Sequence, residues 1–223
     1  GEVLRPDVPV RVDASSKRSK IYHAGAAAQR IETAIREELG ATVSADAAVQ
    51  VRARLEDNLC TLSIDTSGEL LHKRGYKQAV AKAPIRETLA ALFLRQCGYE
   101  GTEPVLDPMC GSGTFVIEAA EIAAGLAPGR AREFAFEQLV GFDRAVWDKM
   151  RIPREPRETD LRFYGSDRDA GAIRVARDNA ERAGVSHLTE FQQCPVSELE
   201  VPDGPPGLVM INPPYGTRIG NKT

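Results

Sequence analysis

The sequence predicts an α/β protein in which a parallel sheet follows a smaller α+β module. From residue 84 onward, apolar segments of strand length alternate with segments of helical periodicity, which is typical of parallel β-α-β units. These apolar segments end in polar motifs, so the polar groups are expected at one edge of the sheet. Residues 1–75 instead contain one amphipathic helix and one hairpin. We therefore expect two domains, 1–75 and 76–223.

The composition is that of an ordinary soluble protein, with 42% hydrophobic and 27% charged residues among 223. No apolar run approaches the ~20 residues of a membrane span and no leader is visible, so we expect a cytoplasmic protein without membrane contact. The formal net charge of -3 argues against a wholesale polyanion binder but leaves room for a local basic face. Cysteines without C-x-x-C spacing predict reduced thiols and no metal site: Cys60, Cys97, Cys110 and Cys194.

The first module begins with a short strand, expected over Val8–Val12, where apolar and polar residues alternate. A polar loop is expected over residues 13–19. A helix is predicted over Ile21–Leu39, because apolar residues recur there every three or four positions, and Gly40 supplies its stop.

The same module continues with a β-hairpin. Residues 49–55 and 60–64 alternate in polarity on either side of an Asp-Asn turn. Arg52 and Arg54 fall on its polar face, where they could hold a phosphate backbone. An ordinary solvated face has the same pattern, and both interpretations stay open at this point.

The second domain starts with a linker at 72–83, followed by a helix from Pro84 to Gly98, since proline is favoured at a first helical position and glycine after a last one. Residues 127–160 are expected as a polar insert with no chemistry of its own. Its large apolar side chains should form a small core of their own: Phe134, Phe136, Leu139, Phe142 and Trp147.

The segment 105–114 reads V-L-D-P-M-C-G-S-G-T and predicts a strand, a glycine loop and a helix that runs to Ala124. Glycines let a ligand lie against bare backbone, and a helix N-terminus favours a carboxylate or phosphate. A phosphate loop would need a lysine, and a dinucleotide loop a third glycine where Val116 stands. Asp107 before the glycines suits a zwitterion such as S-adenosylmethionine (SAM). The alternative is an ordinary strand-to-helix turn.

The next predicted strand, 161–166, again ends in an acid, Asp167, and a helix follows over Asp169–Ala183. An acid at this position of a β-α-β unit can accept both hydroxyls of a ribose. The alternative is that Asp167 or Asp169 only caps the helix. A third strand is expected at 187–192.

A fourth strand, 207–211, runs into Asn212-Pro213-Pro214-Tyr215. The two prolines remove N–H donors, so the Asn212 side-chain oxygen and the Pro213 carbonyl could accept both hydrogens of an exocyclic NH2 group, while Tyr215 offers a ring for stacking. Methyl transfer to a base amine needs no strong general base, only positioning and electrostatic stabilisation. The alternative is a rigid proline turn with a surface tyrosine.

Taken together, D-P-M-C-G-S-G-T, G-S-D-R-D and I-N-P-P-Y-G-T-R-I-G resemble the bacterial class I methyltransferases that modify the N2 amine of guanine in large-subunit ribosomal RNA. S-S-K-R-S-K-I-Y-H-A-G-A is similar to the later part of that family's RNA-binding THUMP domain. The resemblance implies a Rossmann-like methyltransferase sheet, truncated after its fourth strand and preceded by a partial THUMP-like module.

The resemblance also implies residue roles. The SAM-binding set would be Asp107, Gly111, Ser112, Gly113 and Thr114 at the methionine end, Asp167 at the ribose, and Pro84, Ile85, Pro108, Arg168 and Val196 as further contacts. The target amine would be held by Asn212, Pro213, Pro214 and Tyr215. The family usually has an Asp near the adenine, where this chain has Cys194-Pro195.

From these observations we expect a SAM-dependent methyltransferase that acts on guanine N2 in ribosomal RNA, with RNA as partner and no metal. Transfer RNA as substrate, adenine N6 as target, and an inactive RNA-binding relative remain alternatives. The sequence does not predict the oligomeric state.

Overall fold

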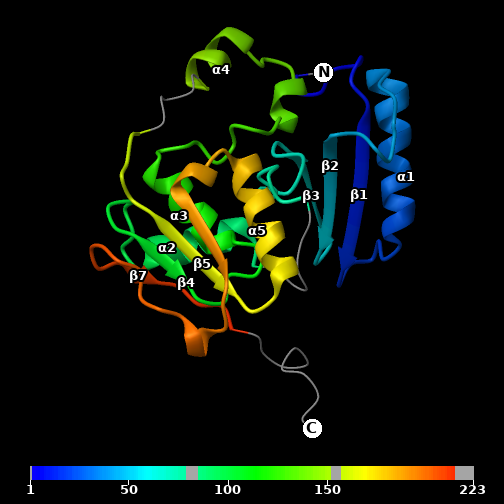
Figure 1. Cartoon of the computed structure of the whole chain (residues 1–223). Helices are drawn as coiled ribbons and strands as arrows, with labels where there is room; N and C mark the ends of the chain where they lie inside the picture. Colours follow the sequence, from blue (N-terminus) through cyan, green and yellow to red (C-terminus); the bar gives the residue numbers. More distant parts are fainter. Residues whose placement is uncertain (1, 79–84, 152–156, 214–223) are drawn as a thin grey trace. The chain divides into compact units, whose positions relative to one another are not determined.

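A computed structural model of the chain describes residues 2–78, 85–151 and 157–213 (Figure 1). It divides into two compact units, one made of residues 1–71 and 133–152 and the other of residues 72–132 and 153–223. We expected one boundary near residue 75 and placed 127–160 in the second domain. The structure instead groups most of that insert with the first unit.

The first unit contains a three-stranded sheet in the order β1-β2-β3. Its strands are β1 (Val10–Lys17), β2 (Val49–Glu56) and β3 (Leu59–Asp65). β1 pairs in parallel with β2 along its whole length, so the polar residues expected as a loop after residue 12 are part of a strand. The backbone ladder outweighs their weak strand propensity.

The β2-β3 hairpin turns where the sequence predicted it. Asp57 and Asn58 both have positive φ, 50° and 65°. A two-residue hairpin turn of the favoured type needs positive φ at both central positions, and Asn and Asp tolerate it best among non-glycine residues. The turn chemistry therefore fixes the register of the hairpin.

α1 (Ala24–Ala34) runs beside β1 (Figure 1) and continues as one π-helical turn over Ile35–Leu39. The helix starts three residues later than expected because the His23 side chain caps it, its Nδ1 accepting from the Ala26 amide at 3.1 Å. Gly40 ends it with φ 73°, as predicted. The core between helix and sheet contains Val10, Val12, Ile35, Ala41 and Val51.

The segment 133–152 carries a 3₁₀ helix, Ala135–Gln138, and α4 (Arg144–Met150). The expected aromatic cluster is present: the Phe136 ring lies 4.8 Å from that of Trp147 and 5.9 Å from that of Phe142. Backbone bonds attach the segment to the first unit, from the Phe136 amide to the Thr66 carbonyl and from the Val140 amide to the Val3 carbonyl. Local sequence gave no sign of these partners.

The second unit contains a four-stranded parallel sheet in the order β6-β5-β4-β7. Its strands are β4 (Val105–Asp107), β5 (Phe163–Asp167), β6 (Thr189–Gln193) and β7 (Leu208–Val209). The chain builds outward from β4 through β5 to β6 and then crosses to the other side of β4. β4 and β7 therefore flank the point where the strand order reverses, which is where open α/β sheets bind ligands.

Three helices accompany this sheet: α2 (Glu87–Gln96), α3 (Thr114–Ala123) and α5 (Ala170–Ala183). α3 packs against both other helices and against β4 and β5. Nearly all of its side chains are buried, which explains why its sequence is apolar on every side. The helix predicted from Pro84 begins later, at Glu87, because its N-cap Arg86 has an extended backbone (ψ 142°); Pro84 itself lies outside the described residues.

The expected linker is partly a structural element of the second unit. Tyr76 is buried, and its hydroxyl donates to Glu118 Oε1 at 3.0 Å. Arg74 Nε lies 2.8 Å from the same oxygen. Burial raises the pKa of Glu118, and the Arg74 guanidinium opposes that rise. Residues 72–78 are thus anchored on α3 by a buried charge network.

In the part of the chain that the structure describes, no helix is both long enough and apolar enough to cross a membrane. No three His, Cys, Asp or Glu side chains gather there in a way that could hold a metal ion.

Candidate functional site

The loop between β4 and α3 is a tight turn tied to its neighbour strand. Asp107 closes β4 and is 2% exposed, and its Oδ1 accepts from the Met109 amide at 3.0 Å. The Cys110 amide donates to the Ser166 carbonyl of β5 at 2.9 Å. The Ser166 hydroxyl donates in turn to the Pro108 carbonyl at 3.3 Å. The backbone of this loop is therefore fixed before any ligand arrives.

The two glycines of the loop serve different purposes. Gly111 has φ 53°, and a Cβ placed on it would meet nothing within 4 Å, so its backbone borders open space. Gly113, the N-cap of α3 with φ 80°, would bring a Cβ within 3.0 Å of the Phe191 ring. Gly111 is thus the position where a ligand could lie against bare backbone, whereas Gly113 is required for packing.

Asp167 at the end of β5 reaches the same loop. Its Oδ2 accepts from the Gly111 amide at 3.0 Å and its Oδ1 from the Asp169 amide at 2.9 Å. The N-cap of α5 is Asp169, whose side chain accepts from the Gly171 amide at 2.7 Å. The capping role considered for either acid therefore falls to Asp169. Each Asp167 oxygen keeps acceptor capacity for a further hydroxyl.

Burial controls the electrostatics of this corner. It raises the pKa of the Asp107 carboxyl to about 7, the Met109 amide opposes the rise, and the charge of Asp167 adds to it. Burial also raises the pKa of the Cys110 thiol, so that thiol stays protonated. A bound cation would favour the ionised form of Asp107. The corner is therefore suited to a positively charged group.

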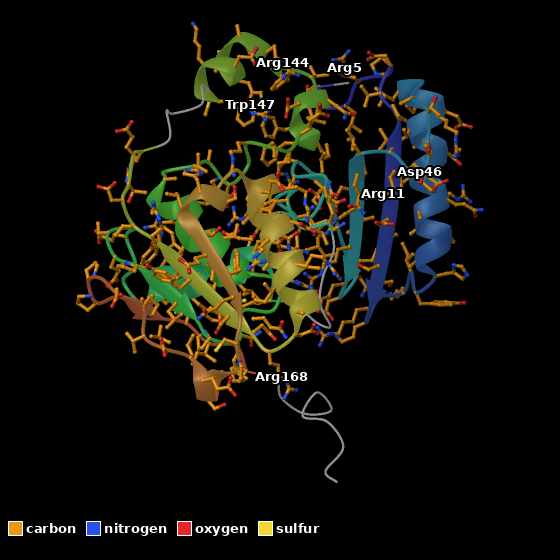
Figure 2. The ribbon with its side chains drawn as sticks, viewed as in Figure 1. Arg5, Arg11, Asp46, Arg144, Trp147 and Arg168 are labelled. Atoms are coloured by element: carbon orange, nitrogen blue, oxygen red, sulfur yellow. The ribbon has the colours of Figure 1, made fainter. Side chains whose placement is uncertain are left out.

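The end of β6 lies beside Asp167. The Cys194 amide donates to the Asp167 carbonyl at 3.0 Å, and Val196 follows at the start of a 3₁₀ helix, Val196–Glu198. The Arg168 side chain is exposed (Figure 2), while its carbonyl accepts from Gln193 Nε2 at 3.1 Å. Cys194 is thus held beside Asp167, whereas the Arg168 side chain is directed to solvent.

The Asn-Pro corner leaves the sheet next to the glycine loop. β7 pairs with β4, and the Met210 amide donates to the Leu106 carbonyl at 2.9 Å. The strand is shorter than expected, and Asn212 and Pro213 follow it at the same edge of the sheet at which Asp107 ends β4. Pro214 and Tyr215, the expected stacking ring among them, lie outside the described residues.

Two observations at the start of α3 were not foreseen. Ser112 Oγ is buried and has no hydrogen-bond partner among the described residues, although the Ser112 carbonyl accepts from Asn179 Nδ2 at 3.1 Å. Lys77, from the expected linker, donates through Nζ to Thr114 Oγ1 and to the Ile85 carbonyl, both at 2.8 Å. The only sequence signal for Lys77 was its place in the basic run before α2.

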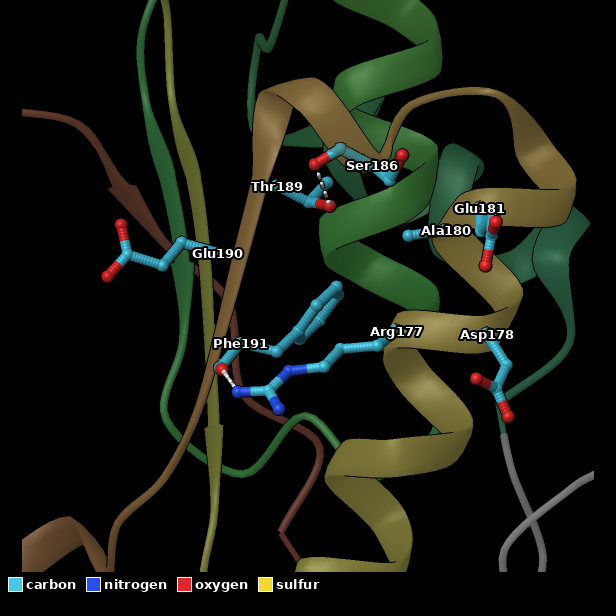
Figure 3. Close-up of a pocket in the computed structure, with 8 residues that line it drawn as sticks. All are labelled: Arg177, Asp178, Ala180, Glu181, Ser186, Thr189, Glu190 and Phe191. Atoms are coloured by element: carbon cyan, nitrogen blue, oxygen red, sulfur yellow. Dashed lines mark hydrogen bonds between the residues drawn. The ribbon is translucent and has the colours of Figure 1, made fainter.

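A separate cleft of about 460 Å³ lies between α5 and β6 (Figure 3). Arg177 extends across it and donates to the Phe191 carbonyl. Its size would suit a small ligand. However, the wall mixes Arg177 with Asp178, Glu181 and Glu190, and none of the predicted site residues lines it. The candidate site therefore remains at the carboxyl ends of β4, β5 and β7.

The two arginines on the polar face of the hairpin each lie in a local ion pair. Arg52 Nη2 lies 3.0 Å from Asp65 Oδ2, and Arg54 pairs with Glu56. Exposed pairs of this kind contribute little to stability, but they reduce the positive charge offered to a phosphate backbone.

The parallel sheet, the glycine loop and the acid at the end of β5 define a Rossmann-like α/β fold of the class I methyltransferase type. Residues 74–223 match the family model of the RMKL-like methyltransferase domain, and the chain belongs to this family. The predicted methyltransferase family is thereby confirmed.

Among its relatives, the ribosomal RNA large subunit methyltransferase K/L of Vibrio campbellii is 41% identical over 182 residues, which is 78% of this chain and 26% of that protein. The chain thus spans about a quarter of the length of the curated relatives it matches. A structure from Listeria monocytogenes, described as a predicted N6-adenine-specific DNA methylase, is 33% identical to this chain with a TM-score of 0.82. The match covers 97% of this chain and 59% of the Listeria chain. A structure described as SMU.472, a putative methyltransferase complexed with S-adenosylhomocysteine (SAH), is 27% identical to this chain with a TM-score of 0.80, and the match covers 97% of this chain and 60% of that chain.

Proposed function

We propose that this chain carries out SAM-dependent methylation of the N2 amine of a guanine in large-subunit ribosomal RNA. The observation that carries the proposal is that Asp107, Gly111 and Asp167 lie together at the carboxyl ends of β4 and β5. The Asn212-Pro213 corner follows the neighbouring strand β7. The proposed donor and acceptor sites thereby share one edge of one sheet, at its switch point.

The residues of the loop fit SAM. Asp107 offers a buried carboxylate to its ammonium, Gly111 offers open backbone, and Ser112 Oγ is a buried polar atom that a ligand could satisfy. Asp167 keeps lone pairs for ribose hydroxyls. The cofactor supplies the methyl group, and the structure of SMU.472 with SAH supports this choice of ligand.

At the acceptor end, Asn212 and Pro213 would take the two amine hydrogens through their oxygens, and Tyr215 would stack on the base. Holding those hydrogens out of the ring plane frees the nitrogen lone pair for attack. The proton leaves after transfer, when the nitrogen is cationic and acidic, so the chain needs no strong base. Positioning and electrostatic stabilisation then account for the catalysis.

The RNA substrate is supported by the name of the Vibrio campbellii relative. We further propose that the first unit is the later part of a THUMP-like module that contacts RNA, with its sheet and α1 as the scaffold. Because the hairpin arginines are paired, RNA contact would involve other groups as well. A ribosomal RNA substrate implies a cytoplasmic location.

The substrate test is methylation of isolated ribosomal and transfer RNA with tritiated SAM, followed by nucleoside analysis. We expect N2-methylguanosine in the large ribosomal RNA. N2-methylguanosine in transfer RNA alone would replace ribosomal RNA by transfer RNA as substrate. A chain that binds neither SAM nor SAH at millimolar concentration by calorimetry would be an inactive relative, and the proposal would be wrong.

Methylation of adenine N6 is a second candidate, favoured by the description of the Listeria monocytogenes relative. An Asn-Pro-Pro-Tyr corner can hold either amine, since both present two hydrogens to two acceptors. N6-methyladenosine in the same digest would select this candidate and reject guanine N2.

The role of Asn212 has its own test. Asn212→Ala removes one of the two proposed acceptors, so we expect methyl transfer to fall by about 100-fold or more, as on loss of a transition-state hydrogen bond. SAM affinity should stay within about 2-fold of the parent chain, because Asn212 belongs to the acceptor end. Loss of SAM affinity in this variant would show that Asn212 had been given the wrong role.

A further inference from the structure

One buried cation lies directly against the proposed cofactor loop. The side chain of Lys77 is 6% exposed, and its Nζ donates at 2.8 Å to both Thr114 Oγ1 and the Ile85 carbonyl. Thr114 is the first residue of α3, so the ammonium sits at the end of the helix whose free amides favour an anion. The linker residue Lys77 therefore contacts both the chain just before α2 and the start of α3.

The charge of Lys77 is less well balanced than its neighbours' charges. The same interior holds two tight pairs, Arg74–Glu118 at 2.8 Å and Arg130–Glu121 at 2.5 Å. Lys77 Nζ instead lies 3.9 Å from Glu87 Oε2, beyond hydrogen-bond distance, and its two hydrogen bonds go to neutral oxygens. A buried ammonium has three donors, so one is left for a further acceptor.

We propose that Lys77 binds the carboxylate of the methionine part of SAM. This inference rests on the proposed function, because it assigns one group of that cofactor. Asp107 and Asp167 make the β4-β5 side of the loop negative, which suits the ammonium and the ribose. Lys77 supplies the opposite charge at the start of α3, so the loop matches a zwitterion at both ends.

Burial lowers the pKa of Lys77, and the carboxylates of Glu87 and Glu118 oppose that change. A bound carboxylate would offset part of the free-energy cost of burying this charge. The competing interpretation is a purely structural one, in which Lys77 only ties the Ile85 carbonyl to Thr114. Replacing Lys77 by a neutral side chain that still donates hydrogen bonds distinguishes carboxylate binding from the purely structural role.

The test compares two ligands, SAH and decarboxylated SAH, which keeps the amine and lacks the carboxylate. Calorimetry on the 223-residue chain gives both dissociation constants for the parent, Lys77→Gln, Lys77→Arg and Lys77→Met. Gln retains an NH2 donor without the charge, and Arg retains the charge. Lys149→Met, a substitution of an exposed lysine in the first unit, is the matched control.

We expect Lys77→Gln and Lys77→Met to bind SAH about 10- to 100-fold more weakly, the loss of one charge-assisted hydrogen bond, with decarboxylated SAH unchanged. Lys77→Arg should recover most of the SAH affinity, and the control should match the parent. Equal weakening for both ligands, or SAH affinity in Lys77→Gln within about 2-fold of the parent, would overturn the inference and leave SAM binding itself intact. If Lys77→Met does not fold, Lys77→Gln decides. A parent chain that binds no SAH overturns the proposed function and this inference together.

Discussion

Replacing Asp107 by asparagine should stabilise the ligand-free chain and at the same time abolish SAM binding. The carboxyl is 2% exposed against the glycine loop, where it accepts a hydrogen bond from the Met109 amide. Asparagine has the same shape and can accept that bond through its own oxygen. It differs from the ionised aspartate mainly in charge, which the buried site disfavours until a cation binds.

The magnitude follows from the pKa of Asp107, which burial raises from 3.8 to about 7. That difference of about 3 corresponds to about 4 kcal/mol at about 1.4 kcal/mol for each tenfold change. We expect the free energy of unfolding of the variant to exceed that of the parent by about 2 kcal/mol where the carboxylate is ionised. The gain is smaller than the full charge penalty because the asparagine NH2 group needs an acceptor that the carboxylate does not. For a chain of this size the gain is about 4–8 °C in the melting temperature.

The stability advantage of Asp107→Asn should depend on pH. The fold favours the protonated carboxyl, so the stability that Asp107 contributes is complete below pH 3.8 and is lost as the pH rises through about 7. Asparagine does not titrate, whereas the parent regains about 4 kcal/mol on protonation, so the variant should be more stable by about 2 kcal/mol at about pH 8 and less stable by about 2 kcal/mol at about pH 4. Urea unfolding at both values, with and without saturating SAM, measures the two effects together.

The matched control is Asp203→Asn, which changes an exposed aspartate of the same unit and should alter neither property. A lower free energy of unfolding for Asp107→Asn at about pH 8 would refute the desolvation argument. SAM that still stabilises the variant as it does the parent would refute the assignment of Asp107 to the ammonium.

Two further predictions concern packing and buried charge. Gly165→Ala would place a Cβ 2.6 Å from the Phe191 ring, so we expect a loss of about 1–3 kcal/mol by urea unfolding; an unchanged midpoint would mean that the ring moves freely. Arg74→Met leaves Glu118 buried without its cation; because burial raises the pKa of that carboxyl to about 8, the loss should approach about 3–5 kcal/mol only above about pH 8 and should shrink as the pH falls and the carboxyl protonates. The double variant with Glu118→Gln should recover most of that loss, and no recovery would contradict the ion-pair explanation.

Local patterns were sufficient wherever the chemistry of neighbouring residues settles the backbone. The Asp57-Asn58 turn and the stop at Gly40 were predicted, because positive φ restricts the choice of residue. The strand, glycine loop and helix around Asp107 were predicted for the same kind of reason. The length of β1 was not, since its polar end becomes a strand only by pairing with β2.

For the candidate site, the sequence identified groups at the carboxyl ends of parallel strands, and the fold places Asp107, Asp167 and Gly111 together. It missed Lys77, which lay in a segment interpreted as a linker. Its link to Thr114 spans 37 positions along the chain. No period or motif within the linker relates those two residues.

The amino-acid order by itself determined the elements, the turn chemistry and the methyltransferase family, because these depend on residues within a few positions of one another. Only the tertiary structure decided that residues 133–152 join the first unit, that Gly113 serves packing while Gly111 borders open space, and that a lysine is buried beside the loop. Each of these depends on partners brought together by folding, and burial, which sets the cost of a charge, exists only once the chain has folded.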